Sequence, residues 1–438
     1  GDHRDLHKEY RRQRQMCIRD RYYWYSTRDF VFVKFFGKLS ACTWQTSDLP
    51  VKELTMAKNG YKMIDAELHV MEPVDLWDKY IADEFRDRAP KRLQEGQWDL
   101  RTMVEGVMMA TMPEAGPHSE PGRIKPDWQF KSEDDVLGAR YKDDIARNFD
   151  PESLVIAMKK EGLDLAVLFP TSGMFVTAKN GMDPRFAAAA CEAYNNWLYD
   201  YMQAGDPSIT FGAGIVSPHD VESAVIETRR CVEKLGFKAI MLRPNMYNNT
   251  PWHNEYYDPL WKECEDLGIA ATFHETTGHR LPALGQDRFP SQVGIAHVAS
   301  HSGEQMMACL DIIMGGVMER FPKLQFAFLE GQCGWLPFWL GRMDEHYEWR
   351  EPYGEMDHLK MDPSEYFRRQ GYAAVEADEE FVSHVVDAFG DDNLLTTTDY
   401  PHADSKFPHA TDTFLGLPMP DASKKKILWD NPTRLYSL

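Results

Sequence analysis

The sequence predicts a (β/α)8 barrel, in which eight parallel strands each lead into a helix that packs outside them. Short apolar runs alternate with longer stretches of helical periodicity from residue 61 to the end of the chain. Strand–helix alternation of this kind is typical of parallel sheets, and eight units suit one barrel with insertions. An open doubly wound sheet is the main alternative, but no GxGxxG turn follows the first predicted strand.

The predicted strands are short apolar runs, at 61–69, 163–169, 209–216, 238–243, 269–274, 324–330, 371–376 and 393–398. Between them, apolar residues recur at helical spacing, and we expect helices at 183–204, 219–236, 255–267, 303–320 and 377–389. In such a barrel the carboxyl ends of all the strands meet at one mouth, where active sites are built.

Two segments depart from this pattern. Residues 72–150, between the first and second strands, are rich in Met, Trp, Pro and Gly. Long segments after a barrel strand lie over the mouth, so we expect this insertion to form a lid or a dimer arm. Residues 1–60 differ in composition, being basic and aromatic at the start, so we expect a disordered or artefactual extension before a barrel domain at 61–438.

Charge and composition exclude several classes of protein. The chain carries 49 Lys and Arg against 69 Asp and Glu, a formal net charge of −20 at pH 7. This balance argues against nucleic acid or an anionic membrane as a partner. No apolar run approaches the roughly 20 residues of a membrane span. The 7 cysteines form no CxxC-type metal pair, so we expect reduced thiols and a cytoplasmic location.

Residues that can bind a metal gather at the ends of predicted strands. Glu67 and His69 are alternate residues at the end of the first strand and therefore point the same way. Later strands end in or next to Arg243, His274, Glu330, and Asp399 with His402. Each alone has a structural explanation, such as a helix cap or a turn. Together they supply the nitrogen and oxygen ligands that a catalytic metal site needs.

These strand ends lie in five recognisable segments: 64–77 (IDAELHVMEPVDLW), 273–278 (FHETTG), 319–337, 398–402 (TDYPH) and 429–436 (WDNPTRLY). As an ordered set they resemble the amidohydrolase superfamily, in the branch related to aminocarboxymuconate semialdehyde decarboxylase. The resemblance covers about 61–438 and is more specific for the branch than for a reaction. It implies a barrel fold, a bound metal and a small-molecule substrate.

Carried over by motif, the resemblance implies one divalent ion, Zn, Mn or Fe, held by Glu67, His69, His274 and Asp399. Asp399 is also the proton-transfer residue that the resemblance implies. The chain departs from decarboxylases of this branch at the sixth strand, where Glu330 replaces the usual His. The fourth strand ends with Arg243, so a dinuclear site bridged by a carbamylated Lys is not expected. A dinuclear site through Glu330, with His301 or His402, stays open.

We therefore expect a metal-dependent decarboxylase or hydrolase acting on a small carboxylate-bearing substrate, aromatic carboxylates included, in a homo-oligomer such as a dimer. The expected catalytic residues are Asp399, Glu330, His274 and Arg243. The expected substrate-binding residues are Arg243, which could instead form a buried salt bridge, and Trp252, His301 and His402. The alternatives are a non-haem diiron oxygenase and a catalytically silent subunit of a hetero-oligomer, and metal content would separate them.

Overall fold

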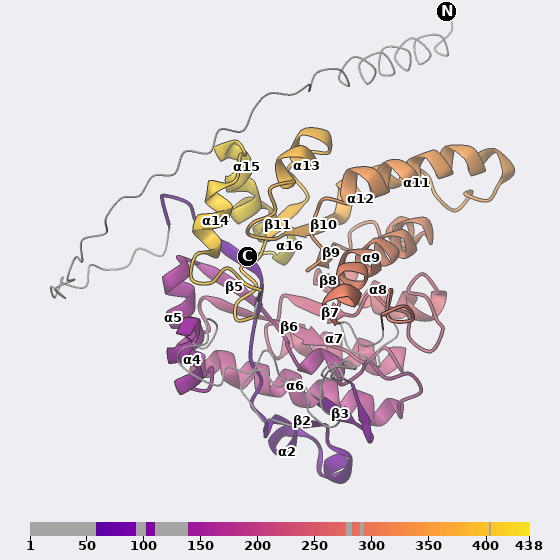
Figure 1. The fold of residues 1–438 in the computed structure, drawn as a ribbon. Coiled ribbons are helices and arrows are strands. Elements are labelled where there is room, and N and C mark those ends of the chain that lie inside the picture. The colour runs from indigo at the N-terminus through magenta and orange to yellow at the C-terminus, as the bar shows by residue number, and fades with distance from the viewer. Residues whose placement is uncertain (1–57, 93–101, 110–138, 277–282, 290–292, 403) are drawn as a thin grey trace, which may run out of the picture. The chain divides into compact units, whose positions relative to one another are not determined.

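The computed structural model describes residues 58–92, 102–109, 139–276, 283–289, 293–402 and 404–438. Its main sheet has eight strands joined side by side in sequence order (Figure 1). They are β1 (Ile64–His69), β5 (Leu165–Phe169), β6 (Thr210–Ile215), β7 (Ala239–Leu242), β8 (Ala270–His274), β9 (Phe326–Leu329), β10 (Gly371–Val375) and β11 (Leu394–Thr396). Every neighbouring pair is parallel. Each strand lies within its predicted range, so the predicted (β/α)8 barrel is confirmed.

Contacts between β1 and the end of β11 close the barrel. The backbone N–H of His69 donates to the Tyr400 carbonyl at 2.8 Å, and the Thr397 hydroxyl donates to the Glu67 carbonyl at 2.9 Å. The buried carboxylate of Asp65 accepts from the backbone N–H of Thr398 at 3.0 Å and from its hydroxyl at 2.5 Å. These bonds fix the two strand ends that carry predicted ligands against each other.

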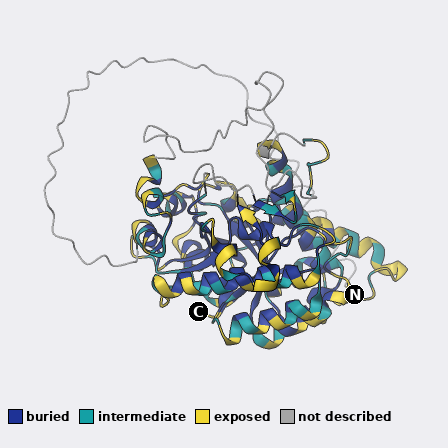
Figure 2. Ribbon diagram, turned by 90° about the horizontal axis from the view of Figure 1, so that it is seen from below, coloured by how far each residue is buried: buried dark blue, intermediate teal, exposed yellow. Residues whose placement is uncertain are grey.

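Helices surround the strands, and Figure 2 shows buried residues toward the barrel with exposed residues on the outer helix faces. The longer helices are α5 (Pro151–Glu161), α6 (Pro184–Ala204), α7 (Val221–Glu233), α8 (Asp258–Leu267), α9 (Val293–Met314) and α11 (Leu336–Arg350). Shorter helices are α10 (Val317–Arg320), α12 (Pro363–Gln370), α13 (Val382–Ala388), α14 (Ala410–Gly416), α15 (Asp421–Lys425) and α16 (Asn431–Tyr436). Single turns are η2 (Gly173–Phe175), η3 (Glu255–Tyr257), η4 (Glu351–Tyr353) and the π-helical η5 (Lys426–Asp430).

Helix ends follow local sequence chemistry. Asp150 caps α5 by accepting from the backbone N–H of Ser153 at 2.8 Å, and Pro151 occupies the first helical position. The same helix ends at Gly162, whose φ of 79° is the left-handed conformation that glycine adopts most easily. These signals explain why helix boundaries such as that of α6 lie close to the predicted ones.

Helix α9 is the clearest difference from the sequence prediction. We expected a helix at 303–320, but α9 begins at Val293 and ends at Met314. Gly316, with φ of 78°, separates α9 from the short helix α10. The earlier start brings His297 into the helix, and this residue becomes important at the site.

The insertion after β1 is partly described. It contains α2 (Leu76–Tyr80), η1 (Asp83–Arg88), α4 (Lys142–Ala146), and a small antiparallel sheet of β2 (Lys91–Arg92), β3 (Thr102–Val104) and β4 (Val107–Met108). Near its end, the hydroxyl of Tyr141 donates to the His402 carbonyl at 3.0 Å, beside the barrel mouth. Residues 93–101 and 110–138 of the predicted lid lie outside the described residues, so the lid stays a prediction.

The predicted extension at 1–60 lies almost entirely outside the described residues. Lys58 is the first residue described, and its ammonium pairs with Asp412 of α14 at 2.9 Å. The domain boundary near residue 60 therefore stays a prediction. Within the part of the chain that the structure describes, helices are too short or too polar to cross a membrane, and 5 buried cysteines are free.

Candidate metal centre

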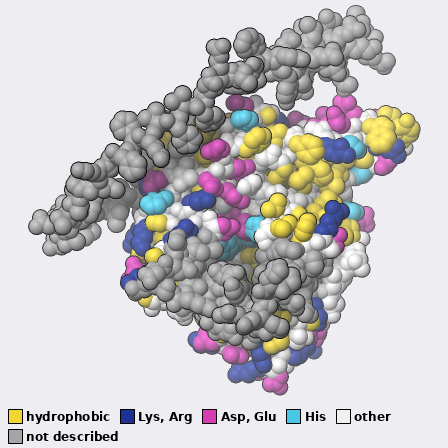
Figure 3. Space-filling model, viewed as in Figure 1, with side chains coloured by type: hydrophobic (Ala, Val, Ile, Leu, Met, Phe, Trp, Pro, Cys, Tyr) yellow, Lys and Arg dark blue, Asp and Glu magenta, His cyan; other side chains and the backbone are white. Residues whose placement is uncertain are grey.

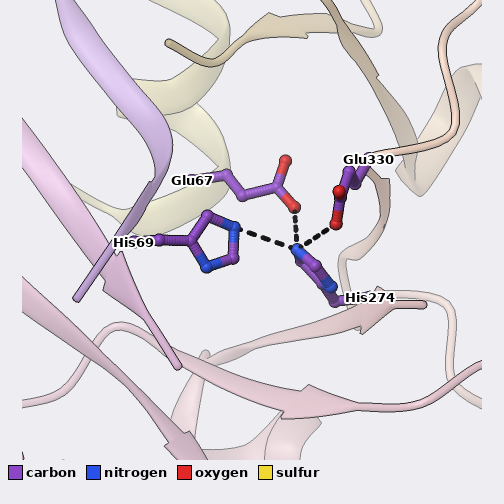
Figure 4. Close-up of side chains that lie close together, drawn as sticks. All are labelled: Glu67, His69, His274 and Glu330. Carbon is purple, nitrogen blue, oxygen red and sulfur yellow. Dashed lines mark hydrogen bonds and ion pairs between the residues drawn. The ribbon is translucent and has the colours of Figure 1, made fainter. Parts of the chain in front are cut away.

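The first two predicted ligands lie on an irregular strand. Between Asp65 and Leu68, β1 has one residue more than its partner β5, which is a β-bulge. The bulge takes the backbone N–H of Glu67 out of the regular ladder, and that N–H donates instead to the Asp65 carboxylate at 3.0 Å. Bulges re-aim side chains next to active sites. Here Glu67 and His69 both point toward His274 (Figure 4).

Four side chains converge at the mouth: Glu67, His69, His274 and Glu330 (Figure 4). The Nε2 atom of His274 is 2.8 Å from Glu67 Oε1, 3.0 Å from Glu330 Oε2 and 3.1 Å from His69 Nε2. Two ligand atoms, each about 2.1 Å from one tetrahedral ion, would be roughly 3.4 Å apart. The observed separations of 2.8–3.1 Å are somewhat shorter than this, so the four ligand atoms lie close enough together to hold one ion after a small outward movement.

Backbone carbonyls determine which nitrogens face the centre. Nδ1 of His69 lies 2.9 Å from the Pro170 carbonyl, and Nδ1 of His274 lies 2.8 Å from the Glu275 carbonyl. A carbonyl can only accept, so each Nδ1 carries the proton and a neutral ring presents the Nε2 lone pair. Two such lone pairs facing each other at 3.1 Å repel unless a cation or a proton lies between them. This orientation of both rings is typical of metal-binding histidines.

The buried carboxylate of Glu67 gives an independent test of whether the residues fit a cation. Glu67 is 1% exposed, and among the described residues its Oε1 faces His274 Nε2 at 2.8 Å while its Oε2 has no hydrogen-bond donor. Leaving an ionised carboxylate buried without donors is costly. A divalent ion would remove this cost, so the donor set fits Zn, Mn or Fe.

Electrostatics point the same way. Burial raises the pKa of Glu67 to about 7, although His274 opposes the change. Burial and the neighbouring His402 hold the pKa of His69 well below its usual range, so this ring is neutral. Burial disfavours a charged His274, but Glu330 and Glu67 together raise its pKa well above the usual range. A bound divalent ion would displace these protons.

Asp399, the fourth predicted ligand, lies at the edge of this group. Its Oδ1 is 3.8 Å from His69 Nε2 but only 2.7 Å from His402 Nδ1. The ring of His402 stacks on that of His69, with centroids 4.0 Å apart. Glu330 completes the four-residue group, whereas Asp399 forms a second group with His69 and His402. Ligation by Asp399 therefore stays a prediction, which His402 would assist by orienting the carboxylate.

Glu330 and Asp399 share a strained backbone. Glu330 directly follows β9 and Asp399 lies three residues after the end of β11, and both have positive φ, 47° for Glu330 and 54° for Asp399. Residues other than glycine rarely adopt this conformation, and such strain concentrates at functional sites. The left-handed backbone turns both carboxylates toward the mouth, whereas side chains of a regular strand would alternate between its two faces.

His301 also reaches Glu330, with its Nε2 3.5 Å from Oε1, and His297 joins the same group. His297 was not among the predicted site residues, because the predicted helix at 303–320 began after it. The signal was present, since His297 and His301 are four residues apart and would share one face of a longer helix.

Two other predicted site residues, Arg243 and Trp252, are buried. Arg243 is 2% exposed, and its guanidinium donates to Glu275 Oε1 at 3.4 Å, so the buried salt bridge is what forms. Trp252 is completely buried, and its indole N–H donates to the Arg243 carbonyl at 3.2 Å. It packs against aromatic neighbours such as Phe273. Direct substrate contact by Arg243 or Trp252 therefore stays a prediction.

A cavity of about 250 Å³ opens beside the cluster and is bordered by Glu330 and Asp399. It is smaller than the roughly 300–1,000 Å³ of pockets for drug-sized ligands, so it suits a small molecule. Its other described lining residues are mostly polar: His297, Gln332, Glu376, Ala377, Asp378, Thr397, Thr398, Asp404, Ser405 and Lys406. An ion at the cluster could therefore meet a small polar molecule from this cavity.

Comparisons with known proteins agree with this architecture. The chain is 26% identical over 267 residues to 2-amino-3-carboxymuconate-6-semialdehyde decarboxylase of Dictyostelium discoideum, covering 61% of this chain and 70% of that protein. It is 25% identical over 253 residues to gamma-resorcylate decarboxylase of Polaromonas sp. (strain JS666 / ATCC BAA-500), covering 56% and 75%.

Among solved structures, the fold is similar to 5-carboxyvanillate decarboxylase of Novosphingobium aromaticivorans DSM 12444, complexed with manganese and 4-hydroxy-3-methoxy-5-nitrobenzoic acid. The TM-score is 0.61 at 19% identity, covering 88% of this chain and 100% of the other. The family model described as amidohydrolase matches residues 64–438. The chain therefore belongs to the amidohydrolase family, in its branch of metal-dependent carboxy-lyases and hydrolases.

Proposed function

We propose that this enzyme is a metal-dependent decarboxylase of a small aromatic carboxylate. The observation that carries the proposal is the convergence of buried nitrogen and oxygen ligands from Glu67, His69, His274 and Glu330 beside a small cavity. The two decarboxylases similar in sequence support the reaction class. The nitrobenzoic acid bound to the similar structure supports an aromatic substrate.

Decarboxylation needs no redox partner. The bond between the ring carbon and the carboxylate carbon breaks, its electron pair stays on the ring carbon, and CO2 leaves. The ring carbon then takes up a proton. A divalent ion held by the cluster would supply positive charge for the substrate's oxygens. Asp399, which borders the cavity, would deliver the proton as general acid.

The surrounding residues would position these groups. His402 holds Asp399 Oδ1 at 2.7 Å, and its own Nε2 lies 3.1 Å from the Thr171 hydroxyl. Arg243 would act indirectly, because it anchors Glu275, whose carbonyl accepts from the His274 ring. We therefore propose Arg243 as a positioning residue, while His301 and His402 would border the substrate.

Hydrolysis is the second candidate, and Glu330 favours it. Decarboxylases of this branch usually have His at the position of Glu330, where a carboxylate can instead take a proton from an attacking water. The 14% exposure of the Glu330 side chain leaves it accessible from the cavity. The class of compound that the enzyme turns over, aromatic carboxylates or esters and amides, distinguishes the two reactions.

The test uses full-length enzyme loaded with Mn(II) and a panel of hydroxylated benzoates in D2O. We expect one CO2 released per substrate consumed, with deuterium at the vacated ring position. Asp399→Asn should lower turnover by roughly 10²–10⁴-fold. Metal content is measured alongside, so that loss of proton transfer is distinguished from loss of the ion.

The matched control is Asp412→Asn, an exposed carboxylate on α14 that pairs with Lys58 and should leave turnover unchanged. Cleavage of esters or amides without CO2 release would make the enzyme a hydrolase. Failure to turn over any compound of either class, with metal fully bound, would point to a silent partner subunit.

We also propose a homodimer. Large apolar side chains are exposed on neighbouring parts of α9, α11 and η4, including Val298 (79%), Phe338 (65%), Trp349 (60%) and Tyr353 (72%). Figure 3 shows hydrophobic side chains gathered in this region. Exposed apolar patches often mark association surfaces, and light scattering of Phe338→Glu against wild type tests this one.

A cytoplasmic location is our further proposal, supported by the 5 buried free cysteines among the described residues.

A further inference from the structure

A second group of metal-ligand side chains adjoins the first. His297 and His301 lie on one face of α9, and their rings stack with centroids 3.6 Å apart and an interplanar angle of 15°. Ligand atoms of His297, His301 and Glu330 all lie within 4.8 Å of one another. An ion pair with Glu330 explains the position of His301, but it does not explain why His297 is brought to the same carboxylate.

Glu330 connects the two groups through different oxygens. Its Oε2 is 3.0 Å from His274 Nε2 in the first group, and its Oε1 is 3.5 Å from His301 Nε2 in the second. The second distance is close to the roughly 3.4 Å expected between two ligands of a tetrahedral ion. A carboxylate that presents one oxygen to each side has the arrangement of a bridging ligand in two-metal sites, whose ions lie about 3.5–4 Å apart.

Charge favours a second cation at this place. Besides His297, the described lining of the cavity includes the carboxylates of Glu330, Glu376, Asp378, Asp399 and Asp404 and one basic residue, Lys406. Lys406 already pairs with Asp378 at 2.8 Å. Glu67 adds a further buried carboxylate in the first group. One divalent ion would leave this surface negative, which opposes binding of a carboxylate substrate.

We propose that the enzyme binds a second divalent transition-metal ion, held by His297, His301 and Oε1 of Glu330, with Glu330 bridging the two ions. Three protein ligands leave room for water or a substrate oxygen from the cavity that His297 and Glu330 line. This second position does not depend on which reaction the centre catalyses. Metal counting therefore tests it separately from the proposed decarboxylation.

The experiment titrates chelator-treated, full-length enzyme with Mn(II) and measures bound metal by equilibrium dialysis and elemental analysis. We expect two ions per chain at saturation, together with the electron paramagnetic resonance spectrum of a spin-coupled Mn(II) pair. His297→Asn and His301→Asn should each bind one ion and give the spectrum of isolated Mn(II). His384→Asn, an exposed histidine on α13, is the matched control and should retain two ions.

Circular dichroism and thermal melting confirm that each variant is folded before its metal is counted. If wild-type enzyme saturates at one ion, the proposal is wrong, whatever its activity. The same holds if His297→Asn and His301→Asn both keep two ions and the coupled spectrum. The wild-type spectrum provides a test even if one variant fails to fold.

Discussion

Replacing Glu67 by Gln should raise the stability of the metal-free enzyme and weaken its stabilisation by metal. Glu67 is buried, and among the described residues its Oε2 has no hydrogen-bond donor while its Oε1 faces only His274. Gln has nearly the same shape and carries no charge, and its amide can donate to the His274 Nε2 that faces Glu67 Oε1 at 2.8 Å. The substitution therefore removes a cost from the fold and a ligand from the ion.

The size of the gain follows from the pKa of Glu67, which burial raises from 4.5 to about 7. Because the folded-state pKa is raised, the neutral carboxyl favours the fold at low pH, and this stability is lost as pH rises through 7. Each tenfold change in the ionisation constant is worth about 1.4 kcal/mol, so the cost at pH 8 is about 3 kcal/mol. With roughly 2.1 cal/mol/K of unfolding entropy per residue over 58–438, this corresponds to about 4 °C in Tm.

The assay is thermal melting of chelator-treated wild type and Glu67→Gln at pH 5 and pH 8, with and without Mn(II). At pH 8 the metal-free variant should melt about 4 °C higher than wild type, and at pH 5 the difference should be smaller. Mn(II) should raise the Tm of wild type, while the variant should respond only at a metal concentration at least roughly 100-fold higher.

Glu379→Gln is the matched control. Glu379 is also buried with its pKa raised to about 7, but it accepts from the backbone N–H groups of Cys333 and Gly334, away from the centre. This variant should keep the full Mn(II) response, which separates the loss of a metal ligand from the removal of a buried charge. If Glu67→Gln lowers the metal-free Tm at pH 8 and binds Mn(II) as wild type does, then Glu67 is a structural residue and the reasoning is refuted.

Three further predictions concern pH, packing and the extension. Mn(II) affinity should rise between pH 6 and 8 in isothermal titration, because Glu67, with its pKa raised to about 7 by burial, must release its proton to bind metal; a flat profile would contradict this. Trp252→Ala should lower the free energy of unfolding by about 3–5 kcal/mol in denaturant melts and leave metal content unchanged. A loss of substrate affinity without loss of stability would instead show that Trp252 binds substrate. Residues 61–438 expressed alone should keep wild-type metal content. Their free energy of unfolding should fall by about 1 kcal/mol or less, because only the Lys58–Asp412 pair is removed. Unfolding or loss of metal would show that the extension belongs to the fold.

The sequence was sufficient to predict the barrel and the convergence of Glu67, His69 and His274 at its mouth. Parallel barrel strands are buried and apolar, so their runs stand out, and topology then forces their carboxyl ends to one mouth. Glu67, His69 and His274 could be identified because each is a polar residue at the end of such a run. Because the fold brings these strand ends to one mouth, Glu67 Oε1 and His69 Nε2 lie 2.8 Å and 3.1 Å from His274 Nε2.

The remaining site residues depend on features that apolar periodicity does not encode. Glu330 completes the first group in place of Asp399, because a local contact at 2.7 Å holds the Asp399 carboxylate beside His402. Arg243 is a strand-end residue too, but its partner Glu275 became evident only in three dimensions. Trp252 lies after a strand like a pocket residue, yet the polypeptide turns back and buries it in an aromatic cluster.

The centre is assembled from irregular backbone, and this has an energetic implication. A β-bulge displaces Glu67 from a regular strand, and left-handed conformations aim Glu330 and Asp399. Each left-handed residue costs about 1–3 kcal/mol, and burying their carboxylates together adds to that cost. Hydrogen bonding within the described cluster offsets little of this cost for Glu67, because its Oε2 lacks a donor and burial still raises its pKa to about 7. A divalent cation offsets the cost, because its charge favours the ionised carboxylates and lies where the neutral imidazole nitrogens point. The strain is therefore best understood as the cost of holding a metal site ready before the ion arrives.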